Sequence, residues 1–169
     1  MPRLLSVNVG LPREVTWHDK TVQTSVWKSP VGGRRMVRRL KVQGDAQGDL
    51  AAHGGEHHAV FDYQMDSYHY WERFLCRSDF TFGQFGENLT VEGLPDNAGC
   101  IGDRYRIGGA AVEVSCAVHN TYTGRGRSVL KLLDRLLHIS STAELEQFEL
   151  PDGMRMENSA KEWQIARLK

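Results

Sequence analysis

The chain is short of cysteine, of long apolar segments and of any signal for export. Its 169 residues include three cysteines, Cys76, Cys100 and Cys116, an odd number at no recurring spacing. Such a set suggests reduced thiols in a cytosolic protein. No apolar run approaches the roughly 20 residues that a transmembrane helix needs, and no segment near the start resembles the apolar core of a signal peptide. We therefore expect a cytoplasmic protein that does not enter a membrane.

An excess of charge of one sign is also missing. Lys and Arg number 21, Asp and Glu number 21, and the formal net charge is zero. This balance gives no reason to expect a nucleic-acid partner. The distribution is uneven, however, because RRMVRRLK, residues 34–41, holds five basic residues and no acidic one. Two interpretations stay open: a solvated strand face, or a local anion site in an otherwise neutral protein.

Short strands are predicted through the first two thirds of the chain. Two β-rich runs, 15–18 and 21–27, flank a polar turn, and GDRYRIGGAAVEVS (residues 102–115) contains two alternating strands joined by a glycine pair. Helical spacing of apolar and aromatic side chains predicts one amphipathic helix within residues 64–76. This pattern predicts a mainly β fold, either a barrel or a strongly curved sheet.

From residue 128 the pattern becomes helical. Four apolar residues share one face of a helix predicted over residues 128–138: Val129, Leu132, Leu133 and Leu136. Ser141 and Glu144 form a capping box for a second helix. We therefore expect a β-barrel domain in residues 1–127 with one or two helices, followed by a helical tail in residues 128–169.

The densest polar cluster is HGGEHHAVFDYQ, residues 53–64. His53 and His57 have the spacing of a helical zinc site, but Gly54 and Gly55 lie between them and disfavour a helix. A second interpretation is a turn with incidental histidines. A third is that the paired glycines let several backbone N–H groups converge on one anion such as phosphate.

In their order and spacing, three segments resemble the MOSC domain, which is named for the C-terminal domain of molybdenum cofactor sulfurase. They are GDLAAHGGEHHAVFDYQMDSYHYW, FGENLTVEGL and IGDRYRIGGAAVEVS. SVNVGLPREVTW and VWKSPVGGRRMVRRLKVQGD resemble the small stand-alone bacterial branch of that family, so the likeness covers about residues 4–115. The resemblance implies a β-barrel that binds the molybdenum cofactor, a pterin dithiolene with a phosphate. It also implies reduction of N-hydroxylated small molecules or sulfur transfer, with an external reductase as a possible partner.

The resemblance further implies which residues form the pocket. Two loops, one with the motif HGG and one with the motif GEN, face each other across it, and basic positions nearby contact the phosphate. The implied cofactor-binding residues are Lys28, Arg34, His53, Gly54, Gly55, Gly86, Glu87, Asn88 and Arg127. Asp45 and Asp49 match positions that fix the geometry of the loop before HGG.

One implied residue differs in chemistry from the family. The position of the family's cysteine, whose thiolate ligates molybdenum or carries sulfur, falls on Thr121. A threonine hydroxyl stays protonated at neutral pH and binds soft metals poorly. Cys116 is the nearest possible substitute, although its odd displacement of five residues places it on the other face of an extended strand. The alternative function is therefore a non-catalytic module that binds the cofactor or another anion, or a degenerate MOSC protein.

Overall fold

The computed structural model describes residues 1–50, 54–94, 101–119, 126–132, 137–139 and 145–147, and from residue 116 onward it describes the backbone alone. The strands are β1 (Arg3–Val9), β2 (Arg13–Trp17), β3 (Lys20–Thr24), β4 (Ser29–Pro30), β5 (Arg35–Arg38), β6 (Lys41–Val42), β7 (Val60–Gln64), β8 (Leu89–Glu92), β9 (Arg104–Ile107), β10 (Ala110–His119), β11 (Gly126–Leu132), β12 (Leu137–Ile139) and β13 (Leu145–Gln147). The helices are the short 3-10 helix η1 (Glu56–His58) and the α-helix α2 (Met65–Leu75). The predicted mainly β class is confirmed.

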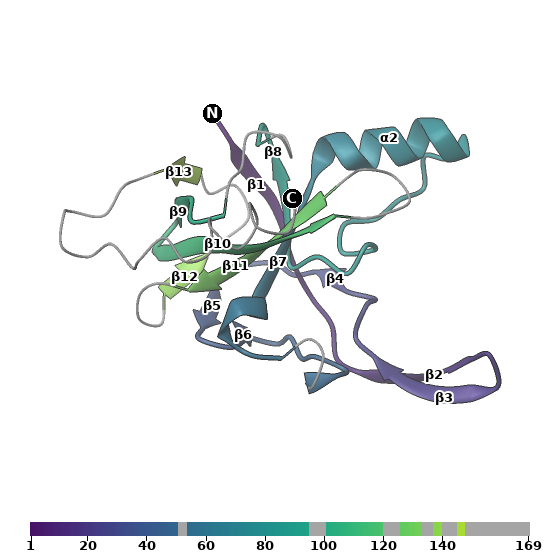
Figure 1. Ribbon diagram of the computed structural model, residues 1–169. Coiled ribbons are helices and arrows are strands. Elements are labelled where there is room, and N and C mark those ends of the chain that lie inside the picture. Colours follow the sequence, from purple (N-terminus) through teal and green to yellow (C-terminus); the bar gives the residue numbers. More distant parts are fainter. Residues whose placement is uncertain (51–53, 95–100, 120–125, 133–136, 140–144, 148–169) are drawn as a thin grey trace, which may run out of the picture.

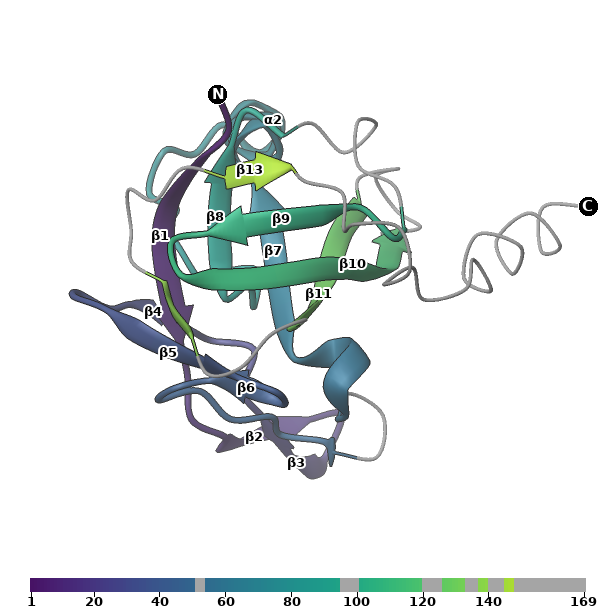
Figure 2. The ribbon, with the colours of Figure 1, turned by 90° about the vertical axis from the view of Figure 1, so that its left-hand side faces the viewer.

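Eight strands form a strongly curved main sheet in the order β13-β9-β10-β11-β7-β8-β1-β4 (Figures 1 and 2). Strands β7 and β8 are parallel. The chain runs through α2 between these two strands, and this crossover returns it to the end of the sheet at which β7 began. A second sheet has the order β12-β5-β6, and β2 and β3 form a separate hairpin that projects from the body (Figure 1).

The described strands do not close into the predicted barrel. At one edge of the main sheet β4 is only two residues long and pairs with β1, and at the other edge β13 pairs with β9. Closure requires the two edge strands to bond to each other, and the register of the described residues includes no such pair. Within the described residues the main sheet is therefore curved and open.

Alternating side chains explain where the core lies. The apolar residues of the central strands point into one cluster and are almost completely buried, including Leu4, Val7, Val60, Leu89, Val91 and Ile107. The predicted hairpin at residues 102–115 is confirmed as β9–β10, and Gly108 in its turn has a φ of 58°. The predicted hairpin around residues 15–27 is confirmed as β2–β3.

The amphipathic helix predicted within residues 64–76 is also confirmed, as α2. It ends at Leu75, and the next residue, Cys76, takes a left-handed conformation with a φ of 50° and donates its backbone N–H to the Arg73 carbonyl. Tyr68 is the large side chain that α2 buries completely. No helix among the described residues combines the length and apolar character that crossing a bilayer requires.

The helix predicted over residues 128–138 is wrong. Residues 126–132 form β11, which lies between β10 and β7 in the main sheet, and residues 137–139 form β12 beside β5. The physical reason is that β10 and β7 both have an edge that needs a partner, and β11 pairs with both of them. A short apolar run is compatible with both a helix and a strand, so pairing with strands distant in sequence determines which of the two forms. Ser141, Glu144 and residues 148–169 lie outside the described residues.

Candidate binding cleft

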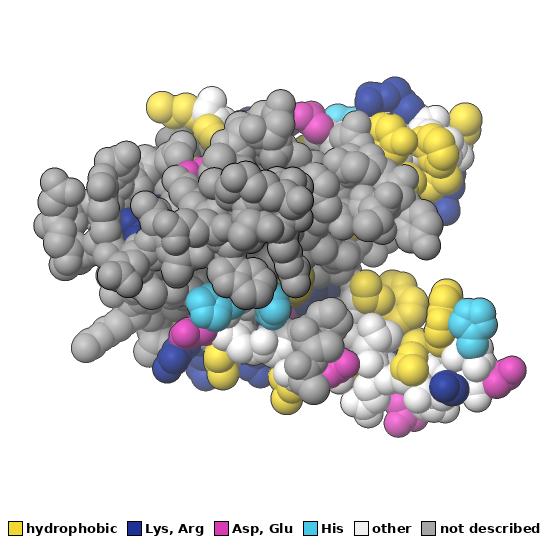
Figure 3. Space-filling model, viewed as in Figure 1, with side chains coloured by type: hydrophobic (Ala, Val, Ile, Leu, Met, Phe, Trp, Pro, Cys, Tyr) yellow, Lys and Arg dark blue, Asp and Glu magenta, His cyan; other side chains and the backbone are white. Residues whose placement is uncertain are grey.

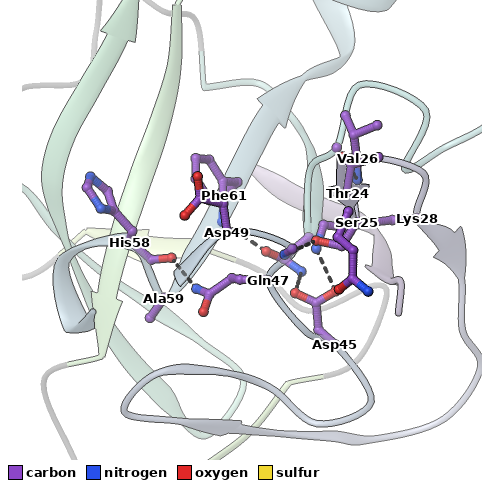
Figure 4. A pocket seen from close by; sticks show the side chains of 14 residues that line it. Thr24, Ser25, Val26, Lys28, Asp45, Gln47, Asp49, His58, Ala59 and Phe61 are labelled. Carbon is purple, nitrogen blue, oxygen red and sulfur yellow. Dashed lines mark hydrogen bonds and ion pairs between the residues drawn. The ribbon is translucent and has the colours of Figure 1, made fainter. Parts of the chain in front are cut away.

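A cleft of about 640 Å³ opens between the hairpin β2–β3 and the main sheet. Its wall comes from the end of β3 and the segment that follows, from the loop after β6, from η1 with the start of β7, and from the turn before β8 (Figure 4). The lining residues are Gln23, Thr24, Ser25, Val26, Lys28, Asp45, Gln47, Gly48, Asp49, His58, Ala59, Phe61, Gly86 and Asn88. The volume lies within the range of small-molecule sites, roughly 300–1,000 Å³.

A buried ion pair forms the floor of the cleft. Lys28 Nζ lies 2.5 Å from Asp45 Oδ1, and the two side chains are only 6% and 3% exposed. The Asp45 carboxylate also accepts hydrogen bonds from the Gly10 backbone N–H at 2.9 Å and from Asn88 Nδ2 at 2.9 Å. Because each buried charge has a partner and further donors complete the carboxylate, the pair is held in one geometry (Figure 4).

Asn88 connects this floor to the main sheet. Its Nδ2 donates to Asp45 and to the Asn8 carbonyl, while its Oδ1 accepts the Phe61 backbone N–H at 3.2 Å. Its own backbone N–H donates to Phe61, and its carbonyl accepts from Asn8 at 2.7 Å. The residue is 1% exposed. Asn88 therefore sets the position of the cleft floor relative to β1 and β7.

Glu87, the middle residue of the GEN motif, points away from the cleft. It is completely buried, and its carboxylate accepts hydrogen bonds from the Tyr68 hydroxyl at 2.5 Å and from Thr90 Oγ1 at 2.9 Å. The backbone N–H groups of Gly83 and Phe85 donate to it at 2.7 and 3.1 Å. Glu87 thus ties the turn before β8 to α2, and of the three predicted GEN residues only Gly86 and Asn88 line the cleft.

Burial and the charge of Glu87 act together on Tyr68. Desolvation of the buried hydroxyl is the larger cause, and the neighbouring carboxylate adds to it, so the pKa of Tyr68 is raised well above its ordinary value. The ring also packs edge-on against Phe80, Phe82 and Phe85. Tyr68 therefore stays a protonated donor and holds Glu87 from the side of α2.

Two glycines let the turn before β8 approach the opposite wall. A Cβ on Gly83 would lie 2.6 Å from the Lys28 carbonyl oxygen, and one on Gly86 would lie 3.1 Å from Val26 Cγ2. Both residues also have a positive φ, 89° and 83°. A side chain at either position would push residues 26–28 outward and alter the cleft.

The HGG loop lies only partly within the described residues. His53 lies outside the described residues, and Gly54 and Gly55 are absent from the lining of the cleft. The Gly54 N–H is used within the loop, where it donates to the Leu50 carbonyl at 3.1 Å. Gly55 has a φ of 100° and begins η1, which carries His58 to the cleft wall. Among the described residues, no group of three or more His, Cys, Asp or Glu is placed to hold a metal ion.

The other predicted residues are only partly brought together. Asp45 and Asp49 both line the cleft, whereas Arg34 is exposed and does not. The backbones of Cys116 in β10 and Arg127 in β11 are described, with Val118 opposite Arg127 in the register, but their side chains are not. Thr121 lies between these strands, outside the described residues. Its predicted role, like those of Cys116 and Arg127, stays a prediction.

Several lining residues were not predicted. The omitted polar residues are Gln23, Thr24 and Ser25 at the end of the hairpin, Gln47 between the two predicted aspartates, and His58 at the end of η1. The repeated GD in QGDAQGD, residues 43–49, was the available signal, since Gln47 and Gly48 lie between Asp45 and Asp49. Gln47 donates to the His58 carbonyl at 3.1 Å and so joins two walls of the cleft.

Comparisons with known proteins place this arrangement in a family. Residues 49–122 match the family model of the MOSC domain. The chain is 41% identical over 112 residues to the uncharacterized protein YflK of Bacillus subtilis strain 168, covering 66% of this chain and 50% of YflK. It is 35% identical over 94 residues to protein YiiM of Escherichia coli K12, covering 54% of this chain and 42% of YiiM. The chain thus spans about half the length of these two relatives.

Solved structures agree with this result. The crystal structure of YiiM from Geobacillus stearothermophilus superimposes with a TM-score of 0.69 and 28% identity, over 90% of this chain and 78% of that one. YiiM from Escherichia coli has the same fold, with a TM-score of 0.63 and 23% identity over 89% of this chain and 71% of that one. Residues 49–122 of the chain are therefore identified as a MOSC domain, and the fold agrees with that of the YiiM structure from Geobacillus stearothermophilus.

Proposed function

We propose that the cleft binds the molybdenum cofactor and that the chain serves the reduction of N-hydroxylated small molecules or the transfer of sulfur. The observation that carries this proposal is the cleft itself, whose floor is preorganised by Lys28, Asp45 and Asn88. Binding of molybdenum cofactor is a property of the MOSC family. When bound, the cofactor supplies a metal that exchanges electrons and oxygen or sulfur, while this chain's residues bind and orient it.

The donor set of the cleft fits a pterin with a phosphate. Apolar contacts from Val26, Ala59 and Phe61 suit the faces of a flat ring, and the amide and hydroxyl groups of Gln23, Ser25, Gln47 and Asn88 suit its polar edge. Lys28 is the one Lys or Arg among the lining residues, and its ammonium can donate to a phosphate while it remains paired with Asp45. Ligand size and chemistry therefore agree with this cofactor.

The threonine at position 121 favours a second candidate function. A hydroxyl does not replace a thiolate as a ligand for molybdenum, so the chain would then hold the cofactor, or another anion of similar shape, without redox chemistry. In the catalytic version, electrons would have to come from an external reductase, and a small N-hydroxylated molecule would be the substrate. Both versions need an intact cleft, and they differ in whether a thiol is required.

Cofactor content tests the proposal. The chain would be purified from a host that makes the cofactor, and molybdenum and pterin per chain would be measured for the wild type and for Thr121→Cys. Val26→Trp fills the cleft, because Val26 lines it and is 41% exposed. Val22→Trp is the matched control, since Val22 is 39% exposed on the hairpin and lies outside the lining.

We expect cofactor in the wild type and in Val22→Trp, and none in Val26→Trp. Cofactor only in Thr121→Cys would point to an intact cleft without its metal ligand and would favour the non-redox candidate. Absence of cofactor from both the wild type and Thr121→Cys, with the circular dichroism of folded protein, would overturn the proposal.

A further inference from the structure

The turn that joins β5 to β6 carries an unbalanced group of cations, Arg38, Arg39 and Lys41, which together with Leu40 we name the basic tip. Inside the hairpin, Val37 and Val42 pair with each other and are 1% and 0% exposed. The next pair outward is Arg38 opposite Lys41, both exposed. Like charges directly opposite on neighbouring strands repel each other. Neither residue has an acidic partner within the part of the chain that the structure describes.

An exposed apolar side chain sits among these cations. The Leu40 residue is 51% exposed. Its backbone carbonyl accepts a hydrogen bond from Gln47 Nε2 at 3.5 Å, which connects the turn to the loop after β6. At protein interfaces Arg is enriched, and the fully buried centre of the contact is more apolar than the rest of the surface.

The basic tip lies directly beside the cleft. Arg39 Nε is 2.7 Å from Glu56 Oε2, which joins the tip to η1, and η1 ends at His58 in the cleft wall. Gln47 bonds to both Leu40 and His58 and lines the cleft itself. Figure 3 shows dark blue basic side chains gathered over the β5–β6 region, next to the cyan histidines. A molecule bound to the tip would therefore reach the rim of the cleft.

We propose that the basic tip is a docking surface for a protein partner with an acidic face around an apolar contact. A small anion is a poorer occupant, because the cations are exposed and Arg39 is 78% exposed at its side chain. Nucleic acid is also a poorer occupant, because the chain has no net positive charge. The inference needs no cofactor in the cleft, so it stands or fails separately from the proposed function.

The test uses a labelled copolymer of glutamate and tyrosine as an acidic polypeptide with apolar side chains, with binding followed by fluorescence anisotropy. Arg38→Glu/Lys41→Glu reverses two charges of the tip, and Arg38→Gln/Lys41→Gln neutralises the same two charges without introducing acidic groups. Lys20→Glu/Arg73→Glu is the matched control, because both of its positions are exposed and lie on β3 and α2. Circular dichroism of each variant verifies that it is folded.

We expect the charge reversal to weaken copolymer binding about tenfold, added salt to weaken the wild type, and the control to bind like the wild type. Leu40→Ser should weaken binding of the copolymer more than binding of polyglutamate. Equal binding by tip and control variants, or no binding by the wild type, would overturn the inference. Tighter binding of an oligodeoxythymidine than of the copolymer would also overturn it, in favour of a nucleic-acid surface.

Discussion

Asp45 shows how a single residue can organise the cleft. Its carboxylate is 3% exposed and is contacted by Lys28 from one wall, Asn88 from the opposite wall and the Gly10 N–H from the end of β1. From the sequence we expected Asp45 to fix a loop, and this is the role that its contacts support. Its pairing with Lys28, which lies 17 positions earlier, depends on how the two segments fold together.

Removing one partner of this pair should destabilise the fold more than removing both. Lys28→Met leaves the Asp45 charge buried with two neutral donors, and we expect it to cost about 3 kcal/mol of unfolding free energy, as for other broken buried pairs. Lys28→Met/Asp45→Asn removes both charges and should recover part of this loss. Urea unfolding of the single and double variants measures the difference. A double variant less stable than Lys28→Met would contradict this account.

Tyr68 should make stability depend on pH in the alkaline range. Its pKa is raised in the folded protein, by desolvation first and by the Glu87 charge second, whereas in the unfolded chain it is near 10. The folded state therefore favours the protonated hydroxyl. Its contribution is complete below pH about 10 and is lost as the pH rises from there toward the folded pKa.

We expect the unfolding free energy of the wild type to fall more steeply above pH 10 than that of Tyr68→Phe, which has no group to ionise. Denaturant titrations at a series of pH values measure both slopes. The other tyrosines and the lysines contribute equally to both proteins, so the difference between the slopes reports on Tyr68. Parallel slopes for the two proteins would show that Tyr68 ionises equally in both states.

Among the secondary-structure elements, β11 is the segment that the sequence predicted to be a helix and that the structure shows to be a strand. The leucines and valine of residues 128–138 fit a helical face, yet the backbone of residues 126–132 pairs with β10 over seven positions and with β7 over two. Helical periodicity is local, whereas a strand's stability depends on partners far away in sequence. Strand β7 lies about 70 residues earlier, and nothing within the segment itself encodes that partner.

Hydrogen exchange distinguishes the two assignments at this scale. Central strands bonded on both sides open only with global unfolding, so amides of Val129 and Leu130 in β11 should exchange among the slowest in the chain. Amides of Thr16 and Val22 in the two-stranded β2–β3 hairpin should exchange much faster, because isolated hairpins are marginally stable. Fast exchange throughout residues 128–132 would show that this strand does not form in solution.

At the scale of the whole molecule, the charge balance governs behaviour in solution. The 21 basic and 21 acidic residues cancel near neutral pH, and a protein without net charge has little electrostatic repulsion between its copies. Exposed apolar side chains on the projecting hairpin, such as Trp17 at 68%, add an attractive contribution. The same neutrality makes the local excess of cations at the basic tip stand out.

Solubility should therefore be lowest near pH 7 and rise on both sides. Precipitation by polyethylene glycol across a pH series measures this directly, with Trp17→Ser as a variant that removes apolar surface while leaving the charge unchanged. We expect Trp17→Ser to be more soluble than the wild type at every pH and to show the same minimum. A minimum displaced far from neutrality would contradict the charge argument.

Features that depend on neighbours along the chain can be predicted from the order of the amino acids. The β9–β10 hairpin follows from alternation around Gly108 and Gly109, α2 follows from helical spacing, and the order of the HGG, GEN and IGD motifs identified the family. Long-range contacts, by contrast, make β11 a strand, leave the described sheets open, and turn Glu87 toward Tyr68 while Asn88 faces the cleft. The reason is physical: strand pairing, burial and the walls of a cleft arise between segments distant in sequence, and local periodicity carries no record of which segments will meet.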